Sequence, residues 1–419
     1  MSTTSTIAKR LAFLFLVIWL LDGNSFYAHA SCDKFSCPRS NNCIGNRCDP
    51  ACFDRNETCH QSCRNEGCSM ACHSAVEKCE QRGYYGEMSC EASNKCDQEC
   101  TDGECSSSCN NTKECEQECK DGSCSLSCDN NSKYCAQICD VASCTAKCND
   151  GVKHCLQRCS DGKTCQQTCN ANETCQQECR KGSGDCSLSC DTKFCKQDCY
   201  KEDCQATCNT GSEANGACRQ KCHEGKCSLS CNTRDCKQEC YEGKECHATC
   251  NTGNGANETC RQKCHEGTCS LSCNSRDCEQ ECYKGKDCQA TCKTGSGANE
   301  TCQQKCYKGK CSLSCNSREC QQECYKGQGC QLTCNSKKCN QVCEYEGCTA
   351  TCGSNVEECT QDCKNGGKCV SYCNAKKCIK KGSQWILGSN GSKSKYGCVG
   401  KRNTHGISLI ALLVVFQAI

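Results

Sequence analysis

The chain has little of what a globular protein uses to build a hydrophobic core. Aromatic residues make up 5% of its 419 residues, and Leu, Ile and Val are scarce outside the two ends. Such a composition cannot bury enough apolar surface to offset the conformational entropy lost on folding. The chain instead holds 69 cysteines, a content far above the level that marks a disulfide scaffold. Cross-links must therefore supply the order that an apolar core supplies elsewhere.

The sequence also lacks the signatures of several functional classes. The formal net charge is +2, with acidic and basic residues interleaved, so we expect no nucleic-acid partner. There is no G-x-S-x-G, no H-E-x-x-H and no C-x-x-C, and we therefore expect no enzymatic activity.

The sequence gives little support for a metal site. The C-x2-C knuckles of structural zinc sites are absent. His223, His247 and His265 beside the cysteines are interpreted as surface residues, because Tyr241 and Tyr307 take equivalent places. We expect no metal and no cofactor. A cysteine-rich metal-binding protein stays as an alternative.

Residues 1–30 have the pattern of a secretory signal peptide. Lys9 and Arg10 precede the apolar stretch Leu11–Leu21, and Ala28-His29-Ala30 provides a cleavage site of the small-x-small kind. All cysteines follow this segment. Export to an oxidising compartment would convert them to disulfides.

The C-terminal end has the pattern of a GPI-anchor signal. A linker at 379–394 contains small residues, of which Ser389, Asn390 and Ser392 are candidate attachment sites. Residues 395–419 would then be removed, including the apolar tail Ile407–Ile419. This predicts an extracellular protein, held at the cell surface by a lipid in the outer leaflet.

Internal repeats dominate the middle of the chain. Similar units begin at Cys175, Cys218, Cys260 and Cys302, and the last three starts are evenly spaced. Each unit holds eight cysteines as four C-x3-C pairs, and looser units extend the pattern. We expect seven tandem repeats, each of about 40 residues, over 96–378. A cysteine-rich N-terminal cap over 31–95 precedes them.

The predicted fold class is an elongated array of small disulfide-rich hairpins with no large hydrophobic core. C-x3-C places both sulfurs on one face of a helix or of a strand. Asn274 followed by Asp277 has the pattern of a capping box, and Gly285 that of a helix C-terminus. We therefore expect short helices for the C-x-Q-x-C pairs, and extended or irregular segments for the Ser-rich pairs.

Hairpins built from helices and hairpins built from strands predict the same nested disulfides. The two inner cysteines are joined to each other, and the two outer cysteines are joined around them. Pairing across neighbouring hairpins stays an open alternative. The predicted pairs are Cys100–Cys105 inside Cys96–Cys109, and Cys222–Cys227 inside Cys218–Cys231.

N-linked glycans are expected at the N-x-S/T sequons, each in a polar stretch. These sequons begin at Asn56, Asn110, Asn130, Asn172, Asn257, Asn299 and Asn390.

Tandem C-x3-C pairs behind a signal peptide and before a GPI-like tail resemble the cysteine-rich repeat proteins of invertebrate extracellular matrices, among them skeletal organic matrix proteins of corals. The resemblance implies a matrix or cell-surface role, including a role in a mineralised tissue. Arrays whose units touch only their neighbours form rods. We therefore expect a non-enzymatic structural protein. An alternative is a multivalent binding module whose partner is a matrix protein or glycan.

Overall fold

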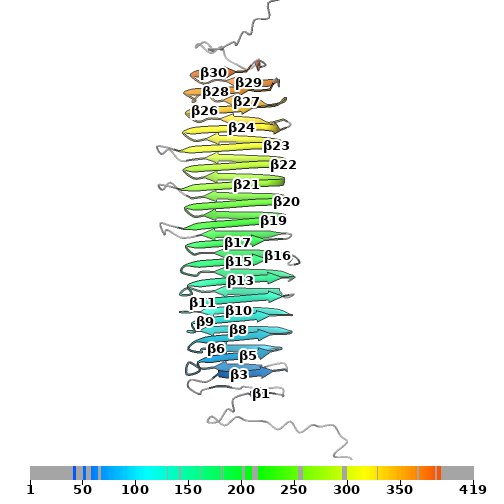
Figure 1. The fold of residues 1–419 in the computed structure, drawn as a ribbon, viewed down its shortest axis with the longest axis vertical. Coiled ribbons are helices and arrows are strands. Elements are labelled where there is room, and N and C mark those ends of the chain that lie inside the picture. Colours follow the sequence, from blue (N-terminus) through cyan, green and yellow to red (C-terminus); the bar gives the residue numbers. More distant parts are fainter. Residues whose placement is uncertain are drawn as a thin grey trace, which may run out of the picture.

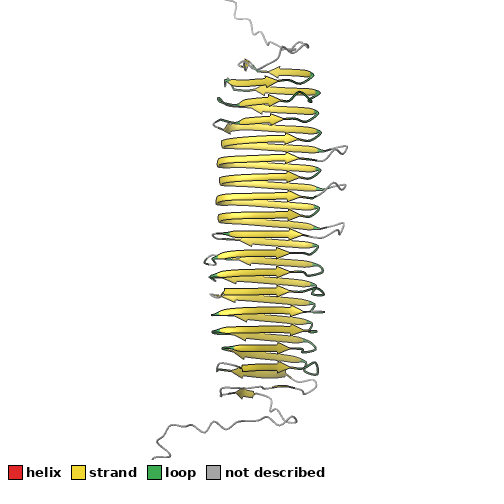
Figure 2. Cartoon of the chain, turned by 180° about the vertical axis from the view of Figure 1, so that it is seen from behind, coloured by secondary structure: helices red, strands yellow, loops and turns green. Residues whose placement is uncertain are grey.

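The chain is a parallel β-solenoid, seen here in a computed structural model. The structure describes residues 41–43, 51–52, 58–64, 68–129, 131–140, 143–161, 163–180, 182, 184–200, 203–209, 216–252, 258–294, 300–327, 329–365, 368–382 and 385–387. Described strands pair with their neighbours in parallel and stack coil on coil into a long column (Figure 1). The described part contains strands and loops without any α-helix (Figure 2). It accordingly holds no helix that is long and apolar enough to span a membrane.

Each coil places one strand in each of two sheets. The first, called the glutamine sheet, holds β1 (Asn41–Cys43), β3 (Thr58–Cys63), β5 (Lys78–Gly83), β7 (Lys95–Cys100), β9 (Glu114–Cys119), β11 (Tyr134–Asp140), β13 (His154–Ser160), β15 (Thr174–Cys179), β17 (Phe194–Cys199), β24 (Glu319–Gly327), β26 (Lys338–Cys343), β28 (Glu358–Cys363) and β30 (Lys377–Lys381). The second, called the serine sheet, holds β2 (Ala51–Cys52), β4 (Cys68–Cys72), β6 (Gly86–Cys90), β8 (Glu104–Asn110), β10 (Ser123–Asp129), β12 (Ser143–Cys148), β14 (Thr164–Cys169), β16 (Asp185–Cys190), β18 (Cys204–Asn209), β25 (Gln331–Cys334), β27 (Thr349–Cys352), β29 (Cys369–Cys373) and β31 (Trp385–Leu387). Five long strands bend through the turn between the sheets and contribute to both: β19 (Ala217–Asn232), β20 (Asp235–Asn251), β21 (Thr259–Asn274), β22 (Asp277–Lys293) and β23 (Thr301–Asn316).

Alternation along each strand decides which side chains face the interior. In C-x-x-x-C, both cysteines and the central residue point inward, because successive residues of a strand face opposite sides. In β10, for example, Cys124 and Leu126 are buried and Ser125 is exposed. Neighbouring coils are in register, so Cys124 lies beside Cys105 and Cys144. Like residues therefore stack on like residues along the column.

A ladder of buried glutamines follows from this register. From Gln81 onward, each Nε2 donates a hydrogen bond to Oε1 of the glutamine in the preceding coil, at 2.7–2.9 Å. Each amide also donates to a backbone carbonyl of the serine sheet, as Gln238 does to Thr249 O at 3.0 Å. Buried amides are stable only when hydrogen-bonded, and stacking of identical side chains meets that need. The ladder consists of Gln61, Gln81, Gln98, Gln117, Gln137, Gln157, Gln177, Gln197, Gln220, Gln238, Gln262, Gln280, Gln304, Gln322, Gln341 and Gln361.

Small aliphatic side chains of the serine sheet face this ladder. Leu and Ala alternate at the centre of successive strands, as at Leu229, Ala248, Leu271 and Ala290, and all are buried. Buried cysteines flank them on both sides and form two continuous clusters along the column. The interior is thus built from sulfur, amide groups and a central row of small aliphatic residues, with further aliphatic side chains such as Val76, Val152 and Val356 at the loop edge.

Disulfides close most of the described coils at the two edges where the chain passes between the sheets. At the turn edge, a glutamine-sheet strand is joined to the serine-sheet strand that follows it, as in Cys222–Cys227, with separations of 5–7 residues. At the loop edge, a serine-sheet strand is joined to the next glutamine-sheet strand, as in Cys231–Cys236, with separations of 5–10 residues. Glycine permits the tightest stacking at the turn edge. Gly267 has φ +98°, and a Cβ there would lie 1.7 Å from the Gly243 carbonyl oxygen.

The predicted array of hairpins with short helices is wrong. Asn274 ends β21, Asp277 begins β22, and Gly285 lies inside β22, so the supposed capping box is a corner between two strands. Neighbouring strands in a sheet are parallel, whereas hairpins are antiparallel. Helix and strand were indistinguishable from the cysteine spacing alone. The central glutamine of C-x-Q-x-C favours the strand. In a stack of parallel strands, each buried amide can hydrogen-bond to the amide of the same position in the next coil.

The even spacing of the sequence repeats corresponds to two coils of unequal length. In the strand register, Cys218 lies beside Cys236, and Cys236 lies beside Cys260. The ladder glutamines of these coils, Gln220, Gln238 and Gln262, are accordingly 18 residues and then 24 residues apart. The longer coil carries its additional residues between β20 and β21, at the loop edge.

The stack also extends beyond the predicted repeat region at both ends. It already includes β3 to β6 before residue 96 and continues to β31 beyond residue 378.

Candidate functional site

The two sheets present chemically different outer faces. On the glutamine sheet, outward residues include a column of alternating charge, in which Lys263 Nζ lies 2.7 Å from Glu281 Oε2 and Lys221 Nζ lies 3.6 Å from Glu239 Oε2. On the serine sheet, the residues between the two cysteines of a strand are mostly Ser, Thr and Gln. One face thus neutralises its charges by ion pairing, and the other carries few charges.

Hydroxyl groups form a continuous row on the serine sheet, which we call the hydroxyl column. It occupies the outward position just before the second cysteine of each serine-sheet strand from β14 to β27. Its members lie side by side in the strand register, at a spacing of ~4.8 Å. The column consists of Thr168, Ser189, Thr207, Ser230, Thr249, Ser272, Thr291, Ser314, Thr333 and Thr351.

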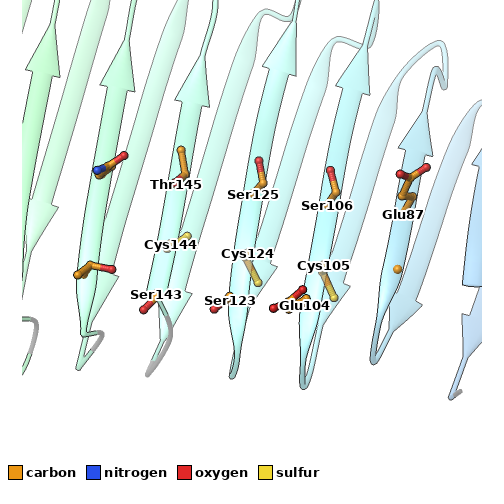
Figure 3. A pocket seen from close by; sticks show the side chains of 13 residues that line it. Glu87, Glu104, Cys105, Ser106, Ser123, Cys124, Ser125, Ser143, Cys144 and Thr145 are labelled. Carbon is orange, nitrogen blue, oxygen red and sulfur yellow. The ribbon is translucent and has the colours of Figure 1, made fainter. Parts of the chain in front are cut away.

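A shallow groove of about 560 Å³ crosses the same face near the turn edge, from β6 to β14. We call it the hydroxyl groove. Figure 3 shows two rows of side chains, with the cysteines of β8, β10 and β12 between them. The groove is lined by hydroxyls of Ser106, Ser123, Ser125, Ser143, Thr145 and Thr164, by the carboxylates of Glu87 and Glu104, and by the amide of Gln166.

The lining of this groove is rich in hydrogen-bonding groups. Hydroxyls both donate and accept hydrogen bonds, and the two carboxylates accept them. The groove can therefore hold a hydrogen-bonding ligand.

A second groove, of about 570 Å³, lies on the outer face of the glutamine sheet near the C-terminal end. Its lining combines four charged residues with uncharged polar residues such as Gln303, Asn340 and Thr360. Lys338 Nζ lies 3.2 Å from Glu319 Oε1, and Glu358 Oε2 lies 3.3 Å from Lys377 Nζ. Three of the four charged lining residues are thus held in ion pairs, and the hydroxyl groove has fewer charged lining residues.

Seven aromatic rings stack at the turn edge, with centroids 4.2–5.1 Å apart and planes within 4–8° of parallel. Each inner ring has neighbours on both faces, so these faces are not free to stack on a sugar ring or base. The stack consists of Tyr200, His223, Tyr241, His265, Tyr283, Tyr307 and Tyr325.

Hydrogen bonds to acidic residues fix Tyr241, Tyr283 and Tyr325 of this stack. The hydroxyl of Tyr241 donates to Glu239 at 2.7 Å. Burial acts to raise the pKa of Glu239, but hydrogen bonds from Tyr241 and Lys237 outweigh it and lower that pKa to about 2. Burial and the bond to Glu239 together raise the pKa of Tyr241 to about 12. Burial also lowers the pKa of both His223 and His265.

The sequence interpretation missed this stack. It treated His223, His265, Tyr241 and Tyr307 as variable surface residues, although their shared place after the glutamine-centred pair was visible. That shared place is the signal, because parallel register puts equivalent residues in contact. His247 lies apart from the stack, on the serine sheet between Ser228 and Ser270.

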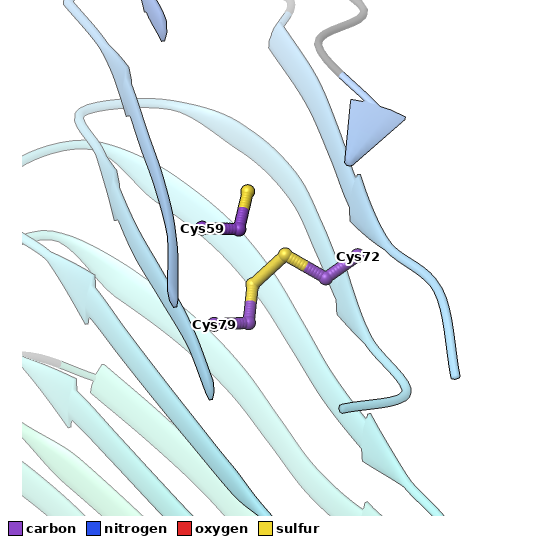
Figure 4. A group of neighbouring side chains, drawn as sticks. All are labelled: Cys59, Cys72 and Cys79. Atoms are coloured by element: carbon purple, nitrogen blue, oxygen red, sulfur yellow. A yellow bond between two sulfur atoms is a disulfide. The ribbon is translucent and has the colours of Figure 1, made fainter. Parts of the chain in front are cut away.

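Several cysteine triplets lie close enough together to suggest a metal site. In one of them, Cys59 lies beside Cys72 and Cys79 (Figure 4). Cys72 and Cys79 are joined to each other, however, and Cys59 is also disulfide-bonded. Metals bind the thiolate form of cysteine. In the oxidised protein, these triplets therefore provide no thiolate ligands.

The disulfide prediction is right for the inner pairs and wrong for the outer pairs. The structure joins Cys100 to Cys105 and Cys222 to Cys227. The predicted Cys96–Cys109 and Cys218–Cys231 are absent, because their members bond outward to adjacent coils. The observed bonds are Cys90–Cys96, Cys109–Cys115, Cys208–Cys218 and Cys231–Cys236. The nested pattern required a hairpin, in which the outer cysteines would face each other.

Two predicted glycosylation sites lie among the described residues, both at the loop edge. Asn110 ends β8, and Asn172 is exposed between β14 and β15. Asn56, Asn130, Asn257, Asn299 and Asn390 lie outside the described residues, as do the candidate anchor residues Ser389 and Ser392 and the signal segment 1–30.

Comparison with family models, with curated proteins and with solved structures finds no match to this chain. The fold and the chemistry of its surfaces therefore carry the functional argument. They establish a cysteine-rich repeat protein with tandem disulfides.

Proposed function

We propose that the protein is a non-enzymatic structural component of an extracellular matrix or cell surface, where it serves as a stiff, disulfide-closed rod. The observation that supports this most is the closure of most described coils by a disulfide at each edge, because it stiffens the column without a conventional core. Stacked at ~4.8 Å for each coil, the described column is about 80 Å long. A uniform column of this kind suits a spacer or a fibril component.

The disulfides and the sequence signals together support an extracellular location. Dense disulfide bonding is typical of oxidising compartments, and residues 1–30 and 379–419 have the patterns of an export signal and of a GPI-anchor signal. The resemblance to invertebrate matrix proteins, including those of coral skeletons, agrees with this role. Glycans at the loop edge would keep such a surface soluble.

Small-angle X-ray scattering of the secreted, oxidised protein tests the rod. We expect a cross-section of two packed sheets and a length of at least about 80 Å. A compact globular profile would contradict the proposal. Treatment of expressing cells with a phosphoinositide-specific lipase tests the anchor separately. Release into the medium is expected, and retention on the cells would count against a GPI anchor.

A further inference from the structure

We propose that the hydroxyl groove binds an extended, uncharged polysaccharide that lies along the axis of the rod. This inference deepens the proposed structural function, on which it rests, by naming the chemical class of its partner. The groove and the neighbouring hydroxyl column are the surfaces that would make the contact. Four observations lead to this assignment.

Charge excludes the common polyanionic partners. Between the two cysteines of each serine-sheet strand from β8 to β27, the ionisable residues are Lys147 and His247. A sulfated or carboxylated glycan needs clusters of Arg or Lys to neutralise it. The groove instead has Glu87 and Glu104 at one end, and these would repel an anionic chain. An uncharged partner fits the surface better.

The hydrogen-bonding groups repeat in the direction that a linear polymer needs. Ser106, Ser125 and Thr145 lie in successive strands of the serine sheet, and Ser123, Ser143 and Thr164 form a second row beside them. Strand spacing sets the repeat at ~4.8 Å, so the five strands of the groove span about 19 Å. Each hydroxyl both donates and accepts, as the hydroxyls of a sugar do.

The protein's own glycans would not cover the groove. Glu104 begins β8 at the groove, whereas Asn110 ends the same strand at the loop edge. The extended chain between them separates the two by about 20 Å. Asn172 likewise lies at the loop edge. The groove therefore lies away from the attachment points of these two glycans.

A second copy of the chain is a poorer partner for this face. Interfaces between identical subunits are typically about 65% apolar, because burial of apolar surface provides the driving force. Ser, Thr and Gln dominate the residues that two facing serine sheets would bury. A partner that supplies hydroxyls in a row gains hydrogen bonds that a second copy of this face does not supply as regularly.

Co-sedimentation with chitin and with cellulose powders tests the proposal on the secreted, oxidised, full-length mature protein. We expect retention on at least one of these neutral glycans. Retention should change little between about 0.05 M and about 1 M NaCl, because salt screens only the attraction between charges. The double variant Ser125→Arg/Thr145→Arg should reduce retention about tenfold or more, because two large cations fill the groove. Both side chains are exposed, so folding should be unaffected.

The matched control is Thr360→Arg, which places the same side chain in the groove of the glutamine sheet. It should leave retention within about twofold of the wild type. Failure to bind either glycan, or binding that the double variant leaves unchanged, would overturn the proposal. So would binding to heparin that high salt abolishes, or a dimer that the double variant dissociates. Scattering from the same sample separates the proposals: an intact rod that binds neither glycan refutes this inference alone.

Discussion

Two adjacent coils near the N-terminal end close the turn edge in different ways. In one, Cys100 and Cys105 form a disulfide. In the preceding coil, formed by β5 and β6, Gly83 and Gly86 occupy the equivalent positions in the register. We call it the methionine coil. The buried side chains of Met70 and Met88 fill the space beside Gly83, where an added Cβ would lie 3.2 Å from Met70 Cε.

This difference shows what the disulfides replace. Where two sulfurs are missing from the edge, two thioether side chains appear in the interior, and the strands stay in register on both sides. Methionine adapts to irregular spaces more readily than other apolar residues. The cross-link and the apolar side chain are thus alternative ways to hold a coil closed. The last described coil also lacks the cross-link: Trp385 lies beside Cys369 in the register and packs against the buried cysteine cluster. From β7 to β29, the described turn edges carry the disulfide.

Complete reduction should have the largest effect. The chain-entropy relation assigns about 2 kcal/mol to each disulfide that closes a loop of roughly six residues, and the bonds of the whole column together exceed the stability of about 5–15 kcal/mol that is usual for a domain. We expect loss of the β-sheet circular dichroism signal after reduction and alkylation. A reduced protein that keeps this signal would show that the glutamine ladder and aliphatic row suffice, and that the methionine coil is no special case.

A charge in the glutamine ladder should cause the next largest loss of stability. The ladder passes through the methionine coil and through the disulfide-closed coil that follows it. Gln98→Glu removes the Nε2 donor that bonds Gln81 Oε1 at 2.7 Å and Ser108 O at 3.1 Å. We expect a loss of about 3–5 kcal/mol in the free energy of unfolding at pH 7. Burial favours the protonated carboxyl, which regains a donor, so the loss should shrink as the pH falls.

Denaturant unfolding with disulfides intact measures this loss. Gln289→Glu is the matched control, because Gln289 is exposed on the serine sheet, and it should change stability by less than about 0.5 kcal/mol. Equal effects at the two positions would show that the buried ladder contributes nothing specific.

Truncation of one buried side chain in each kind of coil should distinguish the methionine coil from a coil that is closed by disulfides. Met88→Ala should cost about 3 kcal/mol, and Leu126→Ala, in a coil closed by disulfides, should cost about as much. Their local effects should differ. Hydrogen exchange should rise over residues 83–90 in the first variant, since no cross-link closes that turn, and should stay low around Leu126 in the second. Equal exchange in the two coils would mean that the disulfide adds no local restraint.

Titration of the aromatic stack should have the smallest effect on stability. The stack lies in disulfide-closed coils, on the C-terminal side of the methionine coil. Glu239 has a folded pKa of about 2, below its ordinary 4.5, so its contribution is present above pH 4.5 and is lost as the pH falls toward 2. His223 and His265 have lowered pKa values, so protonation below pH 6.5 also destabilises the folded state. Tyr241, whose pKa is raised to about 12 from 10.0, loses its contribution as the pH rises through that interval.

Near-ultraviolet circular dichroism between pH 7 and pH 3 measures the acid effect. Tyr241→Phe removes the hydroxyl that donates to Glu239 and should reduce the acid sensitivity of the stack. Tyr84→Phe is the control in the methionine coil, outside the stack. An acid transition that is unchanged in Tyr241→Phe would show that the stack does not depend on this hydrogen bond.

The sequence predicts the chemistry of this fold better than its geometry. Cysteine content predicts cross-linking, and the short spacing between Cys222 and Cys227 brings these residues together in either a hairpin or a solenoid. The outer cysteines required knowledge of strand direction, which the spacing does not contain. The glutamine at the centre of C-x-Q-x-C contained that information, because a buried amide needs partners above and below it in the stack.

The candidate site was not predicted from the sequence. Ser125 and Thr145 are distant in the sequence, and only the parallel register places them in one row. The constancy of C-S-L-S-C was visible, but an outward serine has no meaning until its neighbours across the sheet are known. The Gly83–Gly86 turn was hidden for the same reason, since its missing cysteines appear only in alignment with Cys100 and Cys105.

A disulfide map of the native protein tests the central claim most directly. Trypsin cleaves after Arg234, between Cys231 and Cys236. If successive coils are joined as described, mass spectrometry of the unreduced digest will find residues 227–234 linked to residues 235–237 through Cys231–Cys236 and to residues 222–226 through Cys222–Cys227, and reduction will separate these three peptides. A link between Cys218 and Cys231, or free thiols at these positions, would contradict the disulfide-closed solenoid.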